Sequence, residues 1–76
     1  MNDNYVGPDC AHIRKNLKLS QQQFADRFGF SVSAVRNWEQ GIREPERSAQ
    51  LLLVVISLHP KIAQEAAELL HMLEIS

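Results

Sequence analysis

The chain has 76 residues, of which 45% are hydrophobic and 22% are charged, a balance typical of one small soluble globular domain. Its net charge of −1 gives no overall basic signal for nucleic acid, and so short a chain favours a partner subunit. The single cysteine, Cys10, excludes an internal disulfide, and no cysteines and histidines have the spacing of a metal site. We therefore expect no metal and no cofactor.

Membrane insertion, export and catalysis are also not indicated. The longest apolar run, residues 51–56, is far shorter than the roughly 20 residues needed to cross a bilayer. The first residues lack the basic and apolar regions of a signal peptide. No nucleophile–base pair or phosphate loop stands at a recognisable spacing. We expect a cytoplasmic protein that is not an enzyme and has no membrane partner.

Helix breakers organise the chain after a polar start. Residues 1–8 contain Gly7 and Pro8 and predict a flexible N-terminal arm before a helical domain over 9–76. No segment alternates apolar and polar residues as a half-buried strand would. The breakers within the domain are Gly29, Gly41, Pro45 and Pro60. They leave segments of ordinary helix length, which predicts an all-α fold with five helices.

The first two helices are expected over about 9–17 and about 20–28. Ser20 and Gln23 match the capping-box pattern, in which each side chain bonds the backbone N–H of the other residue. Gly29 is expected to end the second helix in the left-handed conformation that glycine tolerates best.

The third helix is expected over about 31–40, with Ser31 as its N-cap. Its buried stripe contains Val35 and Trp38, with the small Ala34 beside them. Trp38 is also a residue type that stacks on bases, but its place on the Val35 stripe favours the core.

The fourth and fifth helices are expected over about 45–74. Pro45 suits the first turn of the fourth helix, with Glu46 close to the positive end of its dipole. The pair His59-Pro60 interrupts the chain, because a residue before proline avoids the α conformation.

The second and third helices have the spacing of a helix-turn-helix, with residues 29–31 as the turn. The run over 13–45 resembles the lambda-repressor-like, Cro/C1 (Xre) type of helix-turn-helix domain. The matching motifs are R-x-x-x-x-L-S-Q at 14–21, F-A-x-x-F-G at 24–29 and V-x-x-W-E-x-G at 35–41. The form N-W-E-Q-G-x-R-x-P at 37–45, followed by an apolar helix and His-Pro, is similar to HigA-type antitoxins.

The resemblance implies a sequence-specific repressor that binds double-stranded DNA, an autoregulating antitoxin with a toxin protein as a further partner. Antitoxins of this kind commonly carry an additional toxin-binding segment, whereas only about eight residues precede the first helix here and few follow the last. Two alternatives therefore stay open. One is a phage-type or stand-alone repressor without a toxin, and the other is a protein-interaction module whose main partner is a toxin.

Base contacts are expected from the start of the third helix, the recognition helix of this motif. By position the candidates are Val32, Ser33, Arg36 and Asn37. Arg36 can donate two hydrogen bonds to guanine, Asn37 can pair with adenine, and Val32 suits a thymine methyl group. The alternative is that Arg36 and Asn37 are solvated residues of an amphipathic helix.

Phosphate contacts are expected from Ser20, Gln21, Arg43 and Arg47. Ser20 and Gln21 begin the second helix, where backbone N–H groups and the dipole favour an anion. Arg43 and Arg47 flank the start of the fourth helix and would add affinity without sequence choice. Gln21 is otherwise a surface glutamine, and Arg47 an ion-pair partner within its helix.

Arg14 and Glu39 have a structural role in domains that this sequence resembles, where the pair forms a salt bridge. The resemblance thus implies that Arg14 matters for stability more than for specificity. The charge distribution supports a DNA-facing half of the chain. Residues 12–47 hold seven basic and four acidic residues, a net charge of +3, and the remainder holds one basic and five acidic residues, a net charge of −4.

The last two helices are too apolar for one buried face each. Seven apolar residues surround most of the fourth helix, and apolar residues repeat at helical spacing along the fifth. The candidate dimer contacts are Leu53, Ile56, Ile62, Ala66, Leu69 and Leu73. A symmetric homodimer would place two recognition helices about 34 Å apart to read an inverted repeat. The alternative is a compact monomer with an intramolecular apolar core.

Overall fold

The computed structural model describes residues 4–75 and has five helices and no strand within that range. The helices are α1 (Cys10–Asn16), α2 (Gln21–Phe28), α3 (Val32–Gln40), α4 (Arg47–Leu58) and α5 (Pro60–Ile75). The expected all-α class is confirmed. The predicted N-terminal arm lies partly outside the described residues, and residues 4–8 form no helix.

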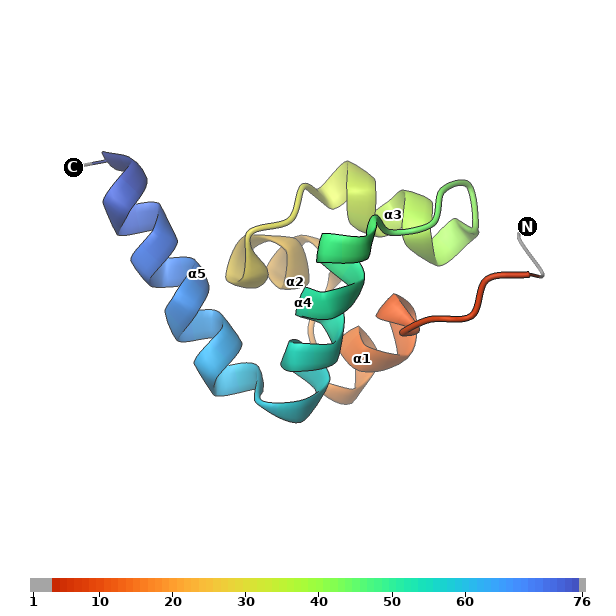
Figure 1. The fold of residues 1–76 in the computed structure, drawn as a ribbon, viewed down its shortest axis with the longest axis horizontal. Coiled ribbons are helices and arrows are strands. Elements are labelled where there is room, and N and C mark those ends of the chain that lie inside the picture. The colour runs from red at the N-terminus through yellow and green to blue at the C-terminus, as the bar shows by residue number, and fades with distance from the viewer. Residues whose placement is uncertain (1–3, 76) are drawn as a thin grey trace.

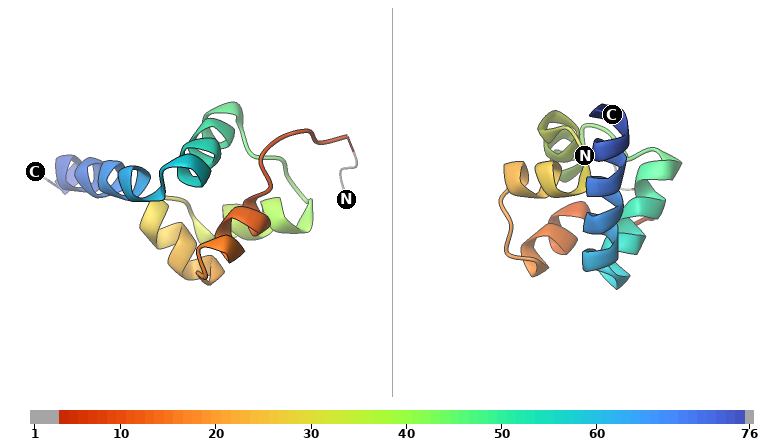
Figure 2. Two further views of the ribbon diagram at one scale, coloured as in Figure 1. Left: turned by 90° about the horizontal axis from the view of Figure 1, so that it is seen from below. Right: turned by 90° about the vertical axis from the view of Figure 1, so that its left-hand side faces the viewer.

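Four helices gather around a common centre, and the fifth projects from it (Figure 1). α5 packs against α2 and α4, whereas its C-terminal half extends beyond the other helices (Figures 1 and 2). This projection, with the segment before α1 at the opposite end, gives an elongated shape that is 41 Å long and 22 and 21 Å across. A long stretch of α5 therefore has little of its own chain to pack against.

The core is formed by side chains that point inward from the helices. The largest fully buried residues are Phe24 of α2, Val35 of α3, and Leu53 and Ile56 of α4. Ala63 is the buried contribution of α5. Because α3 contributes Val35 and the neighbouring half-buried Trp38, one face of this helix is fixed toward the interior.

Local hydrogen bonds set the helix ends as the sequence predicts. The Asp9 carboxylate accepts from the backbone N–H of His12 and caps α1, so Asp9 lies just outside the helix rather than in it. Ser20 and Gln23 form both bonds of the capping box at α2. Gly29 and Gly41 end α2 and α3 with φ of 79° and 74°, the left-handed conformation.

The start of α4 differs from the expectation. Pro45 is not in the first turn, because it is buried before the helix and its carbonyl accepts a hydrogen bond from Gln50 Nε2. Glu46 is the N-cap, with extended backbone and no side-chain capping bond, and α4 begins at Arg47. The chain thus turns into the helix two residues later than Pro45 suggested. The expected break at His59 is present, since α4 ends at Leu58 and α5 begins at Pro60.

The link between α1 and α2 contains a non-glycine residue in the left-handed region. Lys18 has φ of 60°, and its N–H donates to the carbonyl of Lys15. This conformation lies in the four-residue link, residues 17–20, between the end of α1 at Asn16 and the start of α2 at Gln21. Over residues 4–75, no helix is both long and apolar enough to cross a membrane.

Candidate nucleic-acid interface

The helix pair α2 and α3 is joined by a three-residue turn whose geometry is fixed by Gly29 and Phe30. The N–H of Phe30 donates to the carbonyl of Ala25 over 3.0 Å, and the N–H of the left-handed Gly29 donates to the same carbonyl, so both close the C-terminus of α2. The Ser31 hydroxyl then accepts from the N–H of Ala34 and caps α3. The turn therefore ends α2 and starts α3 with defined backbone partners.

Aromatic packing fixes the rotation of α3 about its own axis. The Phe30 ring meets the Trp38 ring edge-on, with centroids 5.0 Å apart, and stacks on Phe24 at 5.9 Å. Trp38 is packed against the core, as its place on the Val35 stripe predicted. Since Val35 and Trp38 face inward, the opposite side of α3 faces solvent.

The solvent side of α3 carries polar side chains at helical spacing. Ser33 and Arg36 are exposed and Asn37 is half-buried, and these three candidate base contacts share one face. Val32 differs, because it is half-buried and packs against the core, at the edge of that face. Gln40 is exposed one turn after Arg36 and was not among the residues predicted from the sequence. Its i, i+4 spacing from Arg36 and i, i+7 spacing from Ser33 were the available signal.

The predicted ion pair between Arg14 and Glu39 ties α1 to the last turn of α3. Arg14 donates to both carboxylate oxygens of Glu39, from Nε over 2.7 Å and from Nη2 over 2.9 Å. Its Nη1 donates to the carbonyl of Leu19 over 2.9 Å. The two side chains are only 13% and 9% exposed, so water screens the pair little. The hydrogen bonds from Arg14 hold the pKa of Glu39 below its ordinary value, and the same contact raises the pKa of Arg14.

Gln21 joins this ion pair instead of lying free on the surface. Its Nε2 donates to Glu39 Oε1 over 3.1 Å, and its side chain is half-buried. Ser20, the other candidate phosphate contact at this end of α2, is exposed but uses its hydroxyl in the capping box. The Ser20 hydroxyl occupies the N–H of Gln23, while the N–H groups of Gln21 and Gln22 have no partner within the helix, so the start of α2 keeps donors for an anion.

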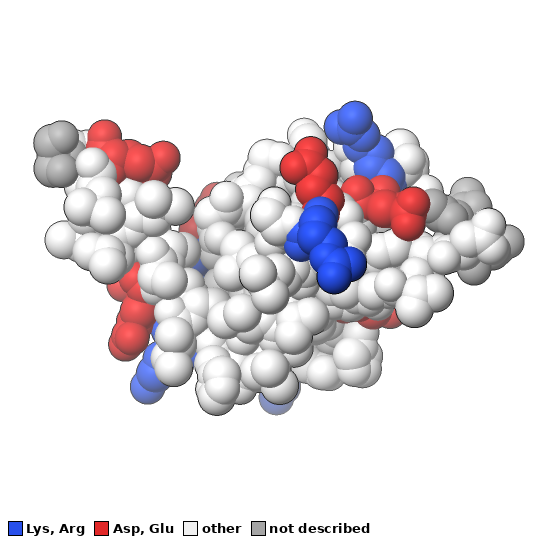
Figure 3. Space-filling view, viewed as in Figure 1, with Lys and Arg blue, Asp and Glu red and all other residues white. Residues whose placement is uncertain are grey.

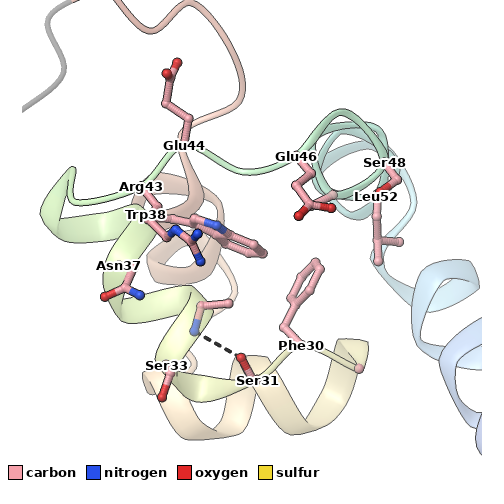
Figure 4. A pocket seen from close by; sticks show the side chains of 13 residues that line it. Phe30, Ser31, Ser33, Asn37, Trp38, Arg43, Glu44, Glu46, Ser48 and Leu52 are labelled. Atoms are coloured by element: carbon pink, nitrogen blue, oxygen red, sulfur yellow. Dashed lines mark hydrogen bonds between the residues drawn. The ribbon is translucent and has the colours of Figure 1, made fainter.

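A hollow of about 680 Å³ separates the start of α3 from the start of α4. Figure 4 shows Phe30 and Trp38 along its inner wall, with Ser33 and Asn37 at the α3 edge. Glu46 points into the hollow and Glu44 points away from it (Figure 4). Arg43 also lines it, and like Arg47 its side chain is exposed. The hollow therefore joins candidate base contacts to a candidate phosphate contact.

The apolar surface of α4 is not the one expected from the sequence. Leu53 and Ile56 are 0% exposed inside their own domain, so their assignment to a dimer interface is wrong. They lie on the core face of α4, because this helix packs across α1 and α5. The exposed apolar stripe of α4 is instead formed by Leu51, Val54 and Leu58. Their i, i+3, i+7 spacing places them on one outward face.

The remaining candidate dimer contacts, all on α5, are exposed. Ile62, Leu69 and Leu73 lie on one side of the helix and are each more than half exposed, and Ala66 is exposed beside them. Figure 3 shows that the face carrying α4 is uncharged over most of its area. Exposed apolar side chains that cluster on a small domain mark an interaction surface.

The described residues contain neither a metal-binding cluster nor a reactive thiol. Residues 4–75 contain no cluster of three or more histidine, cysteine or acidic side chains that could hold a metal ion. Cys10 is buried in the core, and this burial raises the pKa of its thiol to about 12. The thiol is therefore protonated and unreactive at neutral pH.

Comparison with known proteins agrees with this geometry. Residues 11–48 match the family described as helix-turn-helix. Antitoxin MqsA of Escherichia coli is 33% identical over 66 residues, which cover 86% of this chain and 50% of MqsA. Antitoxin HigA-2 of Vibrio cholerae is 34% identical over 65 residues, which cover 84% of this chain and 62% of HigA-2. The chain thus spans between half and two thirds of the length of these two relatives.

Proposed function

The chain belongs to the helix-turn-helix family, and we propose that it is a sequence-specific DNA-binding regulator of transcription that acts as a repressor. The observation that carries this proposal is the outward face of α3, where Ser33, Arg36 and Asn37 stand together on a helix whose rotation is fixed by the aromatic core. An α-helix fits the major groove, where Arg36 would read guanine and Asn37 adenine. Gln40 extends this reading face by one turn.

Backbone phosphates would meet the starts of α2 and α4 on either side of α3. Gln21 begins α2 beside unpaired N–H donors, and Arg43 and Arg47 flank the start of α4. Glu46 provides no side-chain cap at α4, so the first N–H groups of that helix also remain for an anion. Contacts of this kind position the protein and do not select sequence.

Two copies of the chain would cover the exposed apolar side of α5 and the stripe on α4. The projecting half of α5 leaves Leu69 and Leu73 exposed on its own domain. A symmetric dimer would bury both residues in each of its two copies. The dimer would present two α3 helices to an inverted repeat in double-stranded DNA, with the half-sites about 34 Å apart.

The names of the two relatives support a more specific role. Both are antitoxins, so we extend the proposal to an autoregulating antitoxin of the HigA kind that represses its own gene and binds a toxin protein. A second candidate function, docking of a partner protein as the main role, is favoured by an apolar groove of about 740 Å³ between α5 and the end of α2. Phe28, Leu52 and Leu70 are among its apolar lining residues.

Selection of duplexes from a random pool, followed by affinity measurement, tests the proposed function. Arg36→Ala or Asn37→Ala should lower affinity for the selected site by about 1–3 kcal/mol and leave random DNA nearly unaffected. Arg43→Ala should weaken all sequences alike and reduce the salt slope by about one unit. Lys61→Ala, on α5 and away from α3, is the matched control for loss of a positive charge. Micromolar or weaker affinity for every duplex would support docking as the main role instead.

A further inference from the structure

The start of α2 and the end of α3 share one carboxylate, that of Glu39. Its Oε1 accepts from Gln21 Nε2 over 3.1 Å and from Arg14 Nη2 over 2.9 Å, and its Oε2 accepts from Arg14 Nε over 2.7 Å. Three donors from α1 and α2 therefore converge on a single side chain of α3. Of these donors, only Gln21 also stands at the proposed DNA surface.

The carboxylate determines which way the Gln21 amide is turned. An ionised carboxylate only accepts hydrogen bonds, so the Gln21 atom that faces Glu39 must be the amide nitrogen. That nitrogen carries two hydrogens, and Glu39 takes one of them. The second remains for another acceptor, next to the N–H groups of the first turn of α2.

Arg14 places the chain segment that leads into this turn. Its Nη1 donates to the carbonyl of Leu19, which immediately precedes the N-cap Ser20. The same guanidinium thus holds Glu39 and the entry to α2. The side chain and the backbone of Gln21 are consequently set by one network.

We propose that Glu39 is a positioning residue for DNA binding, which holds the Gln21 amide so that its second N–H meets a backbone phosphate. The proposal rests on the proposed DNA-binding function. It differs from a purely structural role for the Arg14–Glu39 pair, because a structural role changes the stability of the fold and not the phosphate contact of Gln21.

A double-mutant cycle on a random-sequence duplex tests this role, since a phosphate contact needs no particular sequence. The variants are Gln21→Ala, Glu39→Met and the two combined, with affinity measured by fluorescence anisotropy at low salt. Each single change should weaken binding about three- to tenfold, the range of one net hydrogen bond. The combined variant should lose no more than the larger single loss. Glu39→Gln keeps an acceptor for Gln21 and should retain most of the affinity.

Ile56→Val is the control for reduced stability, because Ile56 is fully buried in α4 and outside the network. It should weaken the fold while leaving affinity for the duplex unchanged. Losses that add in the combined variant would overturn the positioning role. A wild-type chain that binds no duplex at low salt would instead refute the proposed DNA-binding function.

A measurement on the wild-type chain covers the case in which Glu39→Met does not fold. The side-chain amide signals of Gln21 in a nitrogen–proton correlation spectrum should shift when the duplex is added. They should shift more than those of Gln64, a half-buried residue of α5 whose amide donates to Glu68. Gln21 signals that stay unchanged at saturating duplex would overturn the proposal.

Discussion

Shortening Leu69 to alanine should weaken self-association without unfolding the domain. Leu69 is 57% exposed on the projecting part of α5, and fully burying a leucine contributes about 1.5–3 kcal/mol. Covering the exposed part therefore contributes about 1–1.7 kcal/mol, of which alanine keeps a small share. A symmetric interface contains the residue twice, so we expect a loss of about 1.5–3 kcal/mol, or roughly ten- to a hundredfold in the dimer dissociation constant.

Sedimentation equilibrium over a range of concentrations measures this constant. Glu68→Ala is the matched control, because Glu68 lies on the polar side of α5, where it accepts a hydrogen bond from Gln64. It should leave the dissociation constant unchanged. A wild-type chain that is monomeric at all concentrations, or an equal effect of Leu69→Ala and Glu68→Ala, would refute the assignment of this face to a second copy.

Three further predictions concern the stability of the fold. The pKa of Glu39 is lowered in the folded state, so its ion pair with Arg14 should contribute stability above about pH 4.3 and lose that contribution as pH falls through the lowered pKa. Urea unfolding from pH 6 to 3 measures this loss, and a Glu39→Gln variant with the same pH profile would contradict it. Burial raises the pKa of Cys10 to about 12, so the folded state should lose stability as pH rises from about 9 toward 12. A thiol reagent at pH 8 should label the unfolded chain only, and rapid labelling under native conditions would argue against this burial. Lys18→Gly should stabilise the domain by up to about 1 kcal/mol, because glycine removes the backbone strain of the left-handed φ of 60° and loses only modestly more entropy on folding. An unchanged or lower Tm in thermal unfolding would contradict this prediction.

Local signals in the sequence were sufficient for the helix ends and for the turn between α2 and α3. Ser20 with Gln23, and glycine at 29 and 41, act through bonds to neighbouring residues, so their effect can be read without the rest of the fold. Pro45 was wrongly predicted to lie in the first turn of α4, because its position depends on tertiary packing. Its burial depends on how the segment before α4 packs on the rest of the fold, whereas the hydrogen bond from Gln50 to its carbonyl is local to the start of α4.

The candidate site was predicted in its composition but not in all its contacts. The i, i+3, i+4 pattern placed Ser33, Arg36 and Asn37 on one face, and the same pattern would have added Gln40. The pattern does not reveal that Val32 turns toward the core or that Gln21 donates to Glu39. Gln21 begins α2 and Glu39 lies in the last turn of α3, so they are far apart along the chain. Only the packing of the helices brings Gln21 and Glu39 within hydrogen-bonding distance.

By itself, the sequence determined the five helices, the helix-turn-helix and the polar face of its second helix, because these features follow from capping, chain breakers and helical periodicity. Tertiary structure alone decided which side of the apolar α4 is buried, since a helix that is apolar nearly all round has no periodic signal to separate its faces. It placed Leu53 and Ile56 in the core and left Leu51, Val54 and Leu58 outside. It also decided that α5 extends beyond the domain with its apolar side uncovered, because that depends on the angle at which α5 leaves α4 and not on the residues of α5 alone.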